Sequence, residues 1–353
     1  MLESFVELLR WPVTRSQLTL HCLKKNTKFL DGIAVEIIEE GILFAETNWF
    51  YPIVKGIPRL NVEAVINYAD FLQLHLPDYT SKKEKLFTEH GALIRLTAQK
   101  NRRTKESFTQ EWNLYDYKED KTWNADAEGI LNRFLKETNE TIDTLNGKII
   151  FDAGCGNGTL NCLLAEKGIT NIAMDFSNSI EIAYVRNKYR SVFFIQGDVQ
   201  FPPVAYDIFD IVHCSGVLIH TNNTEFSFGC IEATVKKGGK LSVWLYHPRK
   251  KFIHKLFNFI RKITSKLPLK FQYYLYCCTI LPVSFVIKRL KGNKENVREM
   301  MVSILDWFTP QFRWEHTHEE AVSWFSKRNY SGIIITTDEV FGFNIIGEKI
   351  AGN

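Results

Sequence analysis

The segment FDAGCGNGTL, at residues 151–160, constrains the fold more than any other stretch of this sequence. Directly after a hydrophobic run and an acid, three glycines stand at alternate positions: Gly154, Gly156 and Gly158. This order predicts a buried strand over 148–152, a glycine turn, and a helix from about residue 159. Glycine tolerates a positive φ and lets a ligand approach the main chain, and a helix start offers unpaired N–H groups. The turn therefore favours a nucleotide-like ligand, with packing of the strand against the helix as the alternative.

The spacing of the downstream residues narrows the ligand class. The dinucleotide fingerprint GxGxxG needs a glycine where this chain has Thr159, which argues against a nicotinamide-dependent oxidoreductase. A second predicted strand ends in Asp175, where a carboxylate can accept hydrogen bonds from both ribose hydroxyls or can cap a helix in solvent. A third predicted strand ends in Gly197 and Asp198, a fourth spans 209–213, and a Gly-Gly turn precedes a fifth.

The acid-x-Gly-x-Gly-x-Gly motif and the ordered strands after it resemble the class I S-adenosylmethionine (SAM) methyltransferases of the ubiquinone-biosynthesis-like group. The resemblance implies an α/β Rossmann-like sheet, mostly parallel with an antiparallel last strand, and SAM as the cofactor. It also implies that Asp198 meets the adenine amino group and that Asp152 organises the glycine loop by accepting backbone N–H bonds. The expected cofactor contacts are Asp152, Gly154, Cys155, Gly156, Gly158, Asp175, Phe176, Asp198, Val199, Cys214 and Ser215.

The N-terminal residues resemble a second family, the small zinc-ribbon proteins that activate methyltransferases. The segment YPIVKGIPRL at 51–60 fits the end of that family's pattern, but Trp11 and Thr14 stand where its cysteines would be. Structural zinc needs such thiolates, so we expect no metal and a hydrophobic core that includes Trp11 and Trp49. The predicted domains are an activator-like α+β module over 1–62, a linker and cofactor-covering segment over 63–145, and a methyltransferase domain over 146–353.

Within the linker, TAQKNRRTKES at 97–107 is predicted to be a polar, basic loop. The tripeptide Gln110-Glu-Trp112 after it resembles a lead segment that folds over the cofactor in related fused methyltransferases. Aromatic faces near a sulfonium gain cation–π stabilisation, and packing against the sheet is the equal alternative. The aromatic residues concerned are Trp112, Tyr115, Tyr117 and Trp123.

Charge is unevenly distributed in the last third of the chain. The net charge is +4, yet no Asp or Glu occurs between Glu232 and Glu295, where 15 Lys and Arg are found. Apolar residues at helical spacing and lysines on another face predict a cationic amphipathic helix in a basic helical insertion over 248–305. An apolar run at 271–287 is shorter than the roughly 20 residues of a membrane span. Three interpretations remain open for the insertion: a lid over the substrate, a helix on an anionic membrane surface, or an RNA-binding face.

Histidines are the best candidates for a catalytic base, because methyl transfer to a hydroxyl or amine needs a proton acceptor near neutral pH. His220, just after the fourth strand, is best placed, with His213 and His316 as weaker candidates. The preferred function is SAM-dependent methylation of an O or N atom of a small or lipid-linked acceptor. An RNA methyltransferase and a non-catalytic SAM-binding scaffold are the alternatives.

The cysteine usage and the N-terminus bear on the cellular compartment. The seven cysteines form no CxxC pair, and the first residues lack the features of a signal peptide. We therefore expect a cytoplasmic protein, with a peripheral position at the inner membrane face as an open alternative.

Overall fold

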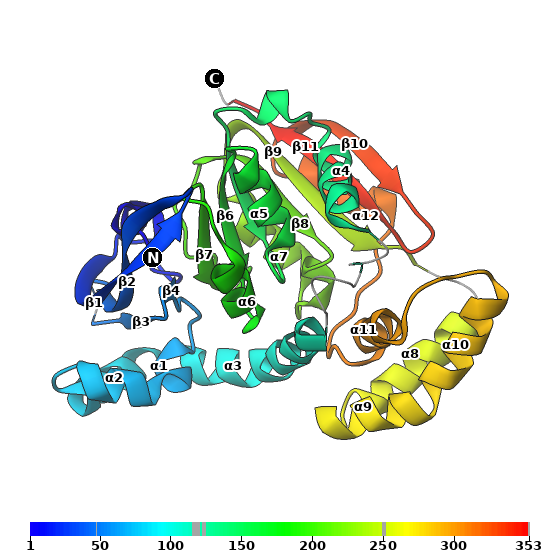
Figure 1. Cartoon of the computed structure of the whole chain (residues 1–353), viewed down its shortest axis with the longest axis horizontal. Coiled ribbons are helices and arrows are strands. Elements are labelled where there is room, and N and C mark those ends of the chain that lie inside the picture. The colour runs from blue at the N-terminus through cyan, green and yellow to red at the C-terminus, as the bar shows by residue number, and fades with distance from the viewer. Residues whose placement is uncertain (47, 115–120, 122–124, 249–251, 352–353) are drawn as a thin grey trace.

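The computed structural model describes residues 1–46, 48–114, 121, 125–248 and 252–351, with backbone only for 252–256. The described chain contains a four-stranded antiparallel sheet near the N-terminus and a seven-stranded mixed sheet (Figure 1). A long helix, α3, and a group of helices, α8 to α11, lie along the same end of the larger sheet.

The N-terminal sheet combines two 12-residue strands with two short ones. A short 3-10 helix, η1 (Glu3–Leu8), precedes it, and its strands are β1 (Thr19–Leu30), β2 (Ile33–Phe44), β3 (Phe50–Val54) and β4 (Ile57–Pro58). Trp11 and Trp49 are both buried, and their ring centroids lie 5.4 Å apart. The predicted tryptophan core of this region is therefore present.

The prediction of a basic loop at 97–107 is wrong. After two short helices, α1 (Ala64–Asn67) and α2 (Ala69–His75), the chain forms a 36-residue helix, α3 (Tyr79–Leu114), which includes the whole of 97–107. Thr97, Asn101, Thr104 and Ser107 are buried on one face of this helix, whereas Gln99, Arg102 and Glu106 are exposed. The predicted aromatic residues Tyr115, Tyr117 and Trp123 lie outside the described residues.

The larger sheet has the predicted α/β architecture. Its order is β10-β11-β9-β8-β5-β6-β7, with β5 to β9 parallel to one another and with β11 antiparallel to both of its neighbours, β9 and β10. The strands are β5 (Ile149–Ala153), β6 (Thr170–Asp175), β7 (Val192–Gln196), β8 (Phe209–Ser215), β9 (Val235–Tyr246), β10 (Tyr330–Asp338) and β11 (Gly342–Lys349). The chain reverses direction across the sheet between β5 and β8, the point at which α/β proteins of this class bind ligands.

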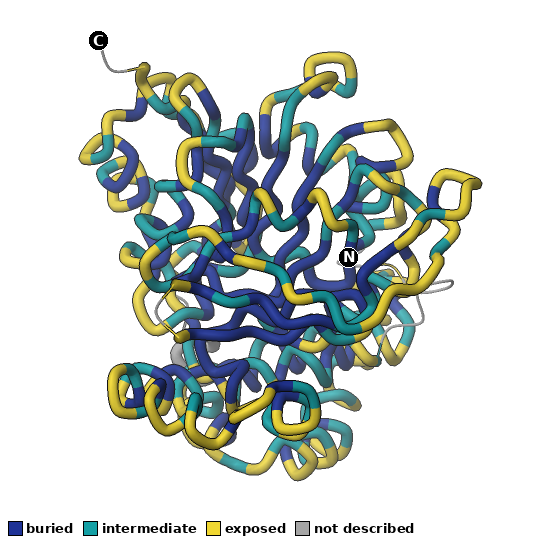
Figure 2. The backbone as a smooth tube through the Cα atoms, turned by 90° about the vertical axis from the view of Figure 1, so that its left-hand side faces the viewer, coloured by how far each residue is buried: buried dark blue, intermediate teal, exposed yellow. Residues whose placement is uncertain are grey.

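Helices cover both faces of this sheet, because successive strand residues point to opposite sides. Ile150 packs with Phe134 of α4 and Leu164 of α5, whereas the next residue, Phe151, belongs to a core that includes Phe228 of α7. The elements concerned are α4 (Ala127–Thr138), η2 (Asp143–Leu145), α5 (Thr159–Glu166), α6 (Ser179–Arg186), η3 (Leu218–His220), α7 (Thr224–Glu232) and α12 (His318–Ser326). Figure 2 shows that buried residues are concentrated in the strands between these layers.

The basic insertion contains four helices, and the first of them, α8, coincides with most of the predicted amphipathic helix. They are α8 (Phe252–Thr264), α9 (Leu269–Cys278), α10 (Ile280–Leu290) and α11 (Val297–Phe308). The apolar run at 271–287 is divided between α9 and α10 at Thr279. None of the helices in the described ranges combines the length and the apolar character that crossing a bilayer requires.

The N-terminal sheet is attached to the edge of the larger sheet. Arg59, just after β4, forms a parallel bridge with Gln196 of β7, and the Leu60 N–H donates to the Gln196 carbonyl at 2.8 Å. The buried Arg59 side chain adds a 2.9 Å contact from Nη2 to Oε1 of Glu181. The backbone of the N-terminal region therefore continues the hydrogen bonding of the larger sheet beyond β7.

Candidate functional site

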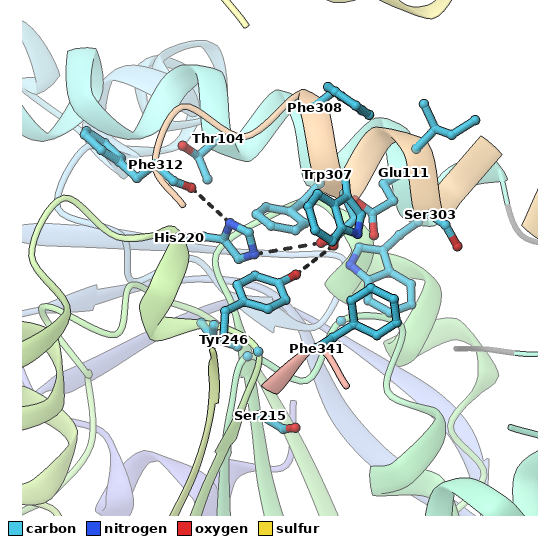
Figure 3. Close-up of a pocket in the computed structure, with 18 of the residues that line it drawn as sticks. Thr104, Glu111, Ser215, His220, Tyr246, Ser303, Trp307, Phe308, Phe312 and Phe341 are labelled. Carbon is cyan, nitrogen blue, oxygen red and sulfur yellow. Dashed lines mark hydrogen bonds and ion pairs between the residues drawn. The ribbon is translucent and has the colours of Figure 1, made fainter. Parts of the chain in front are cut away.

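A cavity of about 1320 Å³ lies at the carboxyl ends of the parallel strands, between the sheet, α3 and the helical insertion. Residues at the ends of all five parallel strands line it, from the glycine loop after β5 to Tyr246 at the end of β9. Figure 3 shows Ser215 and Tyr246 from this set. The far side is lined by α3, α8, α9, α10 and α11. The fold thus brings the predicted glycine loop, the two downstream acids and His220 to one enclosed space.

The glycine loop presents bare main chain to this cavity. Gly154 and Gly156 both line it and both have positive φ, +108° and +54°. A Cβ atom on Gly154 would lie 2.2 Å from a methyl group of Val217, and one on Gly156 would lie 2.5 Å from the Trp112 ring. Glycine is therefore required at these positions by conformation and by space. The third glycine, Gly158, packs against Ala183 of α6 and does not line the cavity.

Two of the predicted acids face the cavity from neighbouring strand ends. Asp175, at the end of β6, accepts the Gly156 N–H at 3.0 Å and the Ser177 N–H at 2.8 Å. Burial raises the pKa of its carboxyl group, which these hydrogen bonds partly counteract. Asp198, after β7, accepts a 2.8 Å hydrogen bond from the side chain of Asn101 on α3. The carboxylate that holds the glycine loop is therefore Asp175, and the prediction that Asp152 does so is wrong.

The helix α3 contributes a polar stripe that sequence reasoning missed. Five buried polar residues recur at steps of three and four along it: Thr97, Asn101, Thr104, Ser107 and Glu111. Asn101, Thr104 and Glu111 line the cavity, and neither the Thr104 hydroxyl nor the Glu111 carboxylate has a hydrogen-bond partner among the described residues. The sequence alone did not reveal this stripe, because the burial of its polar residues becomes visible only in the folded structure.

His220 has the geometry of a base. Its Nδ1 lies 3.0 Å from the carbonyl oxygen of Phe312, so Nδ1 carries the proton that it donates there, and Nε2 is left as an acceptor. Nε2 has no hydrogen-bond partner and lies 3.8 Å from Oδ1 of Asp306, whose Oδ2 accepts a 2.8 Å hydrogen bond from the Tyr246 hydroxyl. Figure 3 shows the contacts of the imidazole with Phe312 and Asp306. Burial lowers the pKa of His220, which favours the neutral imidazole.

His213 does not line the cavity and has both ring nitrogens engaged. Its Nδ1 lies 2.9 Å from Asp152 and its Nε2 lies 2.8 Å from Glu137 of α4. Burial opposes the charged imidazole, but the hydrogen bonds and charges of the two carboxylates raise the pKa of His213 to about 10. We interpret this buried triad as a structural link between β5, β8 and α4.

The other predicted site residues divide between the cavity and its surroundings. His316 is buried beside Trp324, contacts Thr224 and Glu320 at 3.0 Å each, and does not line the cavity. Among the expected cofactor contacts, the cavity is lined by Gly154, Gly156, Asp175, Phe176, Asp198, Val199 and Ser215. Asp152, Cys155, Gly158 and Cys214 lie behind this lining.

The part of the cavity away from the glycine loop is lined mainly by apolar side chains, together with the charged residues Lys288, Lys291, Glu295 and Glu299. The insertion supplies aliphatic and aromatic side chains that include Leu275, Ile280, Val283, Ile287 and Ile304. A ring of aromatic side chains, with Trp307 and Phe341 among them, lies between this part and the strand ends (Figure 3). The cavity therefore combines a polar end at the sheet with an apolar end in the insertion.

One group of described side chains outside the cavity has the chemistry of metal ligands. His247, His318 and Asp338 each offer a ligand atom, and these atoms lie within 4.8 Å of one another. His247 already makes a 2.7 Å contact with Asp338, and Asp338 is largely exposed. None of the three residues has the thiolate chemistry of the zinc-ribbon family.

Comparison with known proteins identifies the central part of this chain. Residues 151–243, from β5 to β9, match the family model described as a methyltransferase domain. Ubiquinone biosynthesis O-methyltransferase of Coxiella burnetii is 31% identical over 101 residues, which are 28% of this chain and 43% of that protein. The chain thus spans less than half the length of the curated relatives that it matches. Its central residues form a methyltransferase domain of the class that uses SAM.

Solved structures of low sequence identity match a larger part of the chain. The 1,6-didemethyltoxoflavin-N1-methyltransferase of Burkholderia thailandensis has a TM-score of 0.43 at 11% identity, over 70% of this chain and 88% of that one. The magnesium protoporphyrin IX methyltransferase of Synechocystis, solved with bound SAM, has a TM-score of 0.39 at 13% identity, over 70% and 95% of the two chains.

Proposed function

We propose that this protein, through its methyltransferase domain, transfers the methyl group of SAM to an oxygen or nitrogen atom of a small or lipid-linked acceptor. One observation carries the proposal: a bare glycine loop, two buried acids and a histidine with a free Nε2 line the same cavity. The sulfonium supplies a methyl group with a good leaving group. The protein's task is then to hold donor and acceptor in line and to accept a proton.

The residues of the cavity fit this cofactor. Gly154 and Gly156 line the cavity with main chain at positive φ, and any larger residue there would clash with Val217 or Trp112. Asp175 and Asp198 each accept protein hydrogen bonds and keep further lone pairs for a ribose and an adenine amino group. We assign the sugar to Asp175 and the base to Asp198, with Phe176 and Val199 beside the ring system.

In the proposed step, a lone pair of the acceptor's oxygen or nitrogen forms a bond to the methyl carbon. The carbon–sulfur bond breaks, and its electron pair remains on sulfur. The acceptor's proton goes to Nε2 of His220, whose Nδ1–H is fixed by the Phe312 carbonyl. Asp306, at 3.8 Å from Nε2, stabilises the imidazolium that forms.

Binding of SAM should depend on Asp175. In Asp175→Ala, we expect the affinity for SAM to fall by about 10- to 100-fold, since charge-assisted hydrogen bonds contribute about 1.5–3 kcal/mol. Isothermal titration of the full chain measures this, and Asp143→Ala, an exposed aspartate on η2, is the control. Unchanged affinity in a folded Asp175 variant would contradict the site assignment.

The outer surface of the insertion supports a lipid-linked acceptor and contact with an anionic membrane. All residues of α10 are described and none is buried, although the helix is mostly apolar. Large apolar side chains that are exposed on α8 to α10 and do not line the cavity are Phe259, Ile263, Phe271, Tyr274, Phe285, Val286 and Leu290. Lysines lie among them and the sequence contains no acid there, a combination that favours an anionic lipid surface.

Membrane contact is tested by flotation with vesicles of phosphatidylcholine, with or without phosphatidylglycerol. We expect binding only to the anionic vesicles. The double variant Lys266→Gln/Lys270→Gln should bind about 30-fold more weakly at low salt, at about 1 kcal/mol per basic residue. Lys85→Gln/Lys167→Gln removes two exposed lysines outside the insertion and is the matched control. Equal loss in both variants would contradict a specific surface on the insertion.

We further propose that residues 1–62 are an activator-like module without its metal, fused to the methyltransferase domain of 146–353. The packing of Trp11 on Trp49, where the zinc-ribbon family has thiolate ligands nearby, supports this. The attachment of Arg59 and Leu60 to β7 supports a stabilising role for the module.

Labelled SAM identifies the acceptor class. We expect label from SAM to enter the lipid fraction of a cell extract incubated with the full chain. Label in nucleic acid that nuclease treatment removes would favour an RNA acceptor. SAM binding without transfer to any fraction would favour a scaffold.

A further inference from the structure

Glu111, on the last turn of α3, is a buried carboxylate that nothing in the catalytic proposal uses. Its side chain is fully buried, it lines the cavity, and neither Oε1 nor Oε2 has a hydrogen-bond partner among the described residues. Buried carboxylates are normally paired, because an unpaired one loses its hydration without compensation. An unpaired carboxylate aimed into a cavity therefore indicates a ligand group that is bound there.

The surroundings of Glu111 determine what kind of group this is. Burial raises the pKa of Glu111 well above its usual value, and the charges of Asp306 and then Asp175 raise it further. In the described part of the chain, no lysine or arginine forms an ion pair with Glu111. Asp306 itself is nearly buried, and its polar neighbours are the Tyr246 hydroxyl and, more distantly, His220. Among the described residues, Glu111 has no positive partner, and the only basic group paired with Asp306 is His220 at 3.8 Å, which burial keeps in the neutral form.

We propose that Glu111 and Asp306 bind the amino group of the methyl acceptor, in its ammonium form. This rests on the proposed methyltransferase function and narrows its acceptor to an amine. An ammonium has three N–H donors and one positive charge, so it satisfies both acids at once. A hydroxyl has a single donor and would leave the paired acids uncompensated.

The position of Asp306 next to His220 suits the methylation of an amine. An ammonium has no lone pair, so one proton must leave before its nitrogen can attack the methyl carbon. Nε2 of His220 lies 3.8 Å from Asp306 and has no other partner, so it can take that proton. The methylated nitrogen then remains a cation after transfer, and its charge is again matched by the two acids.

The apolar end of the cavity defines the rest of the acceptor. Leu275, Ile280, Val283 and Ile287 line it on α9 and α10 and continue away from the acids toward the exposed face of the insertion. Burial of a hydrocarbon chain in such a channel contributes about 0.8 kcal/mol per methylene. The ligand that fits both ends is an amphiphilic amine with an alkyl or isoprenoid-like tail.

The probe for this site is n-decylamine, with n-decanol as the neutral partner of the same chain length. Both are titrated calorimetrically into the full chain, alone and saturated with S-adenosylhomocysteine. We expect the amine to bind at least about 10-fold more tightly than the alcohol, since hydrogen bonds to charged groups contribute about 1.5–3 kcal/mol. In Glu111→Gln this preference should fall about 10-fold, with unchanged binding of the alcohol and of S-adenosylhomocysteine.

Two further variants keep the test interpretable. Glu84→Gln, an exposed glutamate on the same helix, is the matched control and should behave as the unmodified chain. Asp306→Asn changes the second acid of the proposed pair, on α11, and should lower the preference for the amine in the same way. Glu111→Gln should melt no lower than the unmodified protein, because it removes an uncompensated buried carboxylate and no protein contact.

Two results would overturn the proposal. The first is equal affinity for the amine and the alcohol. The second is a Glu111→Gln variant that binds SAM more weakly, yet binds S-adenosylhomocysteine and the amine as before, since Glu111 would then serve the sulfonium. Failure of the unmodified chain to bind SAM or S-adenosylhomocysteine would instead contradict the proposed function. The preference for the amine over the alcohol is measured without cofactor as well, so the two failures can be told apart.

Discussion

Replacing His220 with alanine is expected to lower the rate of methyl transfer by about 10²- to 10⁴-fold, the usual contribution of a positioned general base. The affinity for SAM should stay the same, because the glycine loop and the two acids do not contact the imidazole in any hydrogen bond. Single-turnover transfer of labelled methyl, with cofactor saturating, measures the chemical step. His316→Ala, which removes a histidine behind the cavity, is the control and should retain activity.

The pH dependence tests the same role. Burial lowers the pKa of His220 below its ordinary value of about 6.5, so the base form should persist at neutral pH. We expect the rate to be flat near neutrality and to fall as the pH drops through that lowered pKa. The fall should be absent from the residual activity of His220→Ala. A rate that falls in the variant as in the unmodified protein would assign the titration to another group.

Replacing His213 with alanine is expected to destabilise the fold by about 3–5 kcal/mol, because it leaves two buried carboxylates without their shared partner. Asp152 and Glu137 are both buried, and each lies within 3 Å of the imidazole. Urea denaturation followed by circular dichroism measures the change in the free energy of unfolding. His21→Ala, at an exposed position of β1, should change it by no more than about 0.5 kcal/mol.

The same triad predicts how stability depends on pH. The pKa of His213 is raised to about 10 in the folded protein from about 6.5 in the unfolded chain. The stabilisation is therefore fully present below about pH 6.5 and is lost as the pH rises through about 10. The variant His213→Ala should lack this alkaline loss. A variant as stable as the unmodified protein at neutral pH would refute the structural role of the triad.

The parts of the fold that depend on local patterns could be predicted from the sequence. The glycine loop and Asp175 were predicted from their spacing, because a strand end, a glycine turn and an acid on the next strand are all local features. The parallel sheet and its closing hairpin follow from the order of hydrophobic runs, and the structure contains both. The sequence did not show which acid holds the glycine loop, Asp152 or Asp175. Asp152 is paired with His213, 61 residues away, through a contact that only the sheet creates.

The contribution of α3 could not be predicted, because its charged residues resemble a solvated loop. Lys100, Arg102, Arg103 and Lys105 lie in a polar stretch without hydrophobic periodicity. Its helix is held by tertiary contacts on a polar face, such as the hydrogen bond of Asn101 to Asp198. A search for hydrophobic periodicity does not find a face of this kind. The candidate base His220 was found from its position after β8, but its tautomer depends on a carbonyl 92 residues away.

The attachment of Leu60 to Gln196 has a consequence for how the chain resists aggregation. β7 is the edge strand on the parallel side of the mixed sheet, and an uncovered edge strand offers its backbone to other molecules. The peptide around Arg59 and Leu60 occupies those backbone groups next to Gln196. The N-terminal region thus covers part of the edge of the larger sheet. A shortened chain that begins after it would expose a template for intermolecular strand pairing, whatever its ability to bind cofactor.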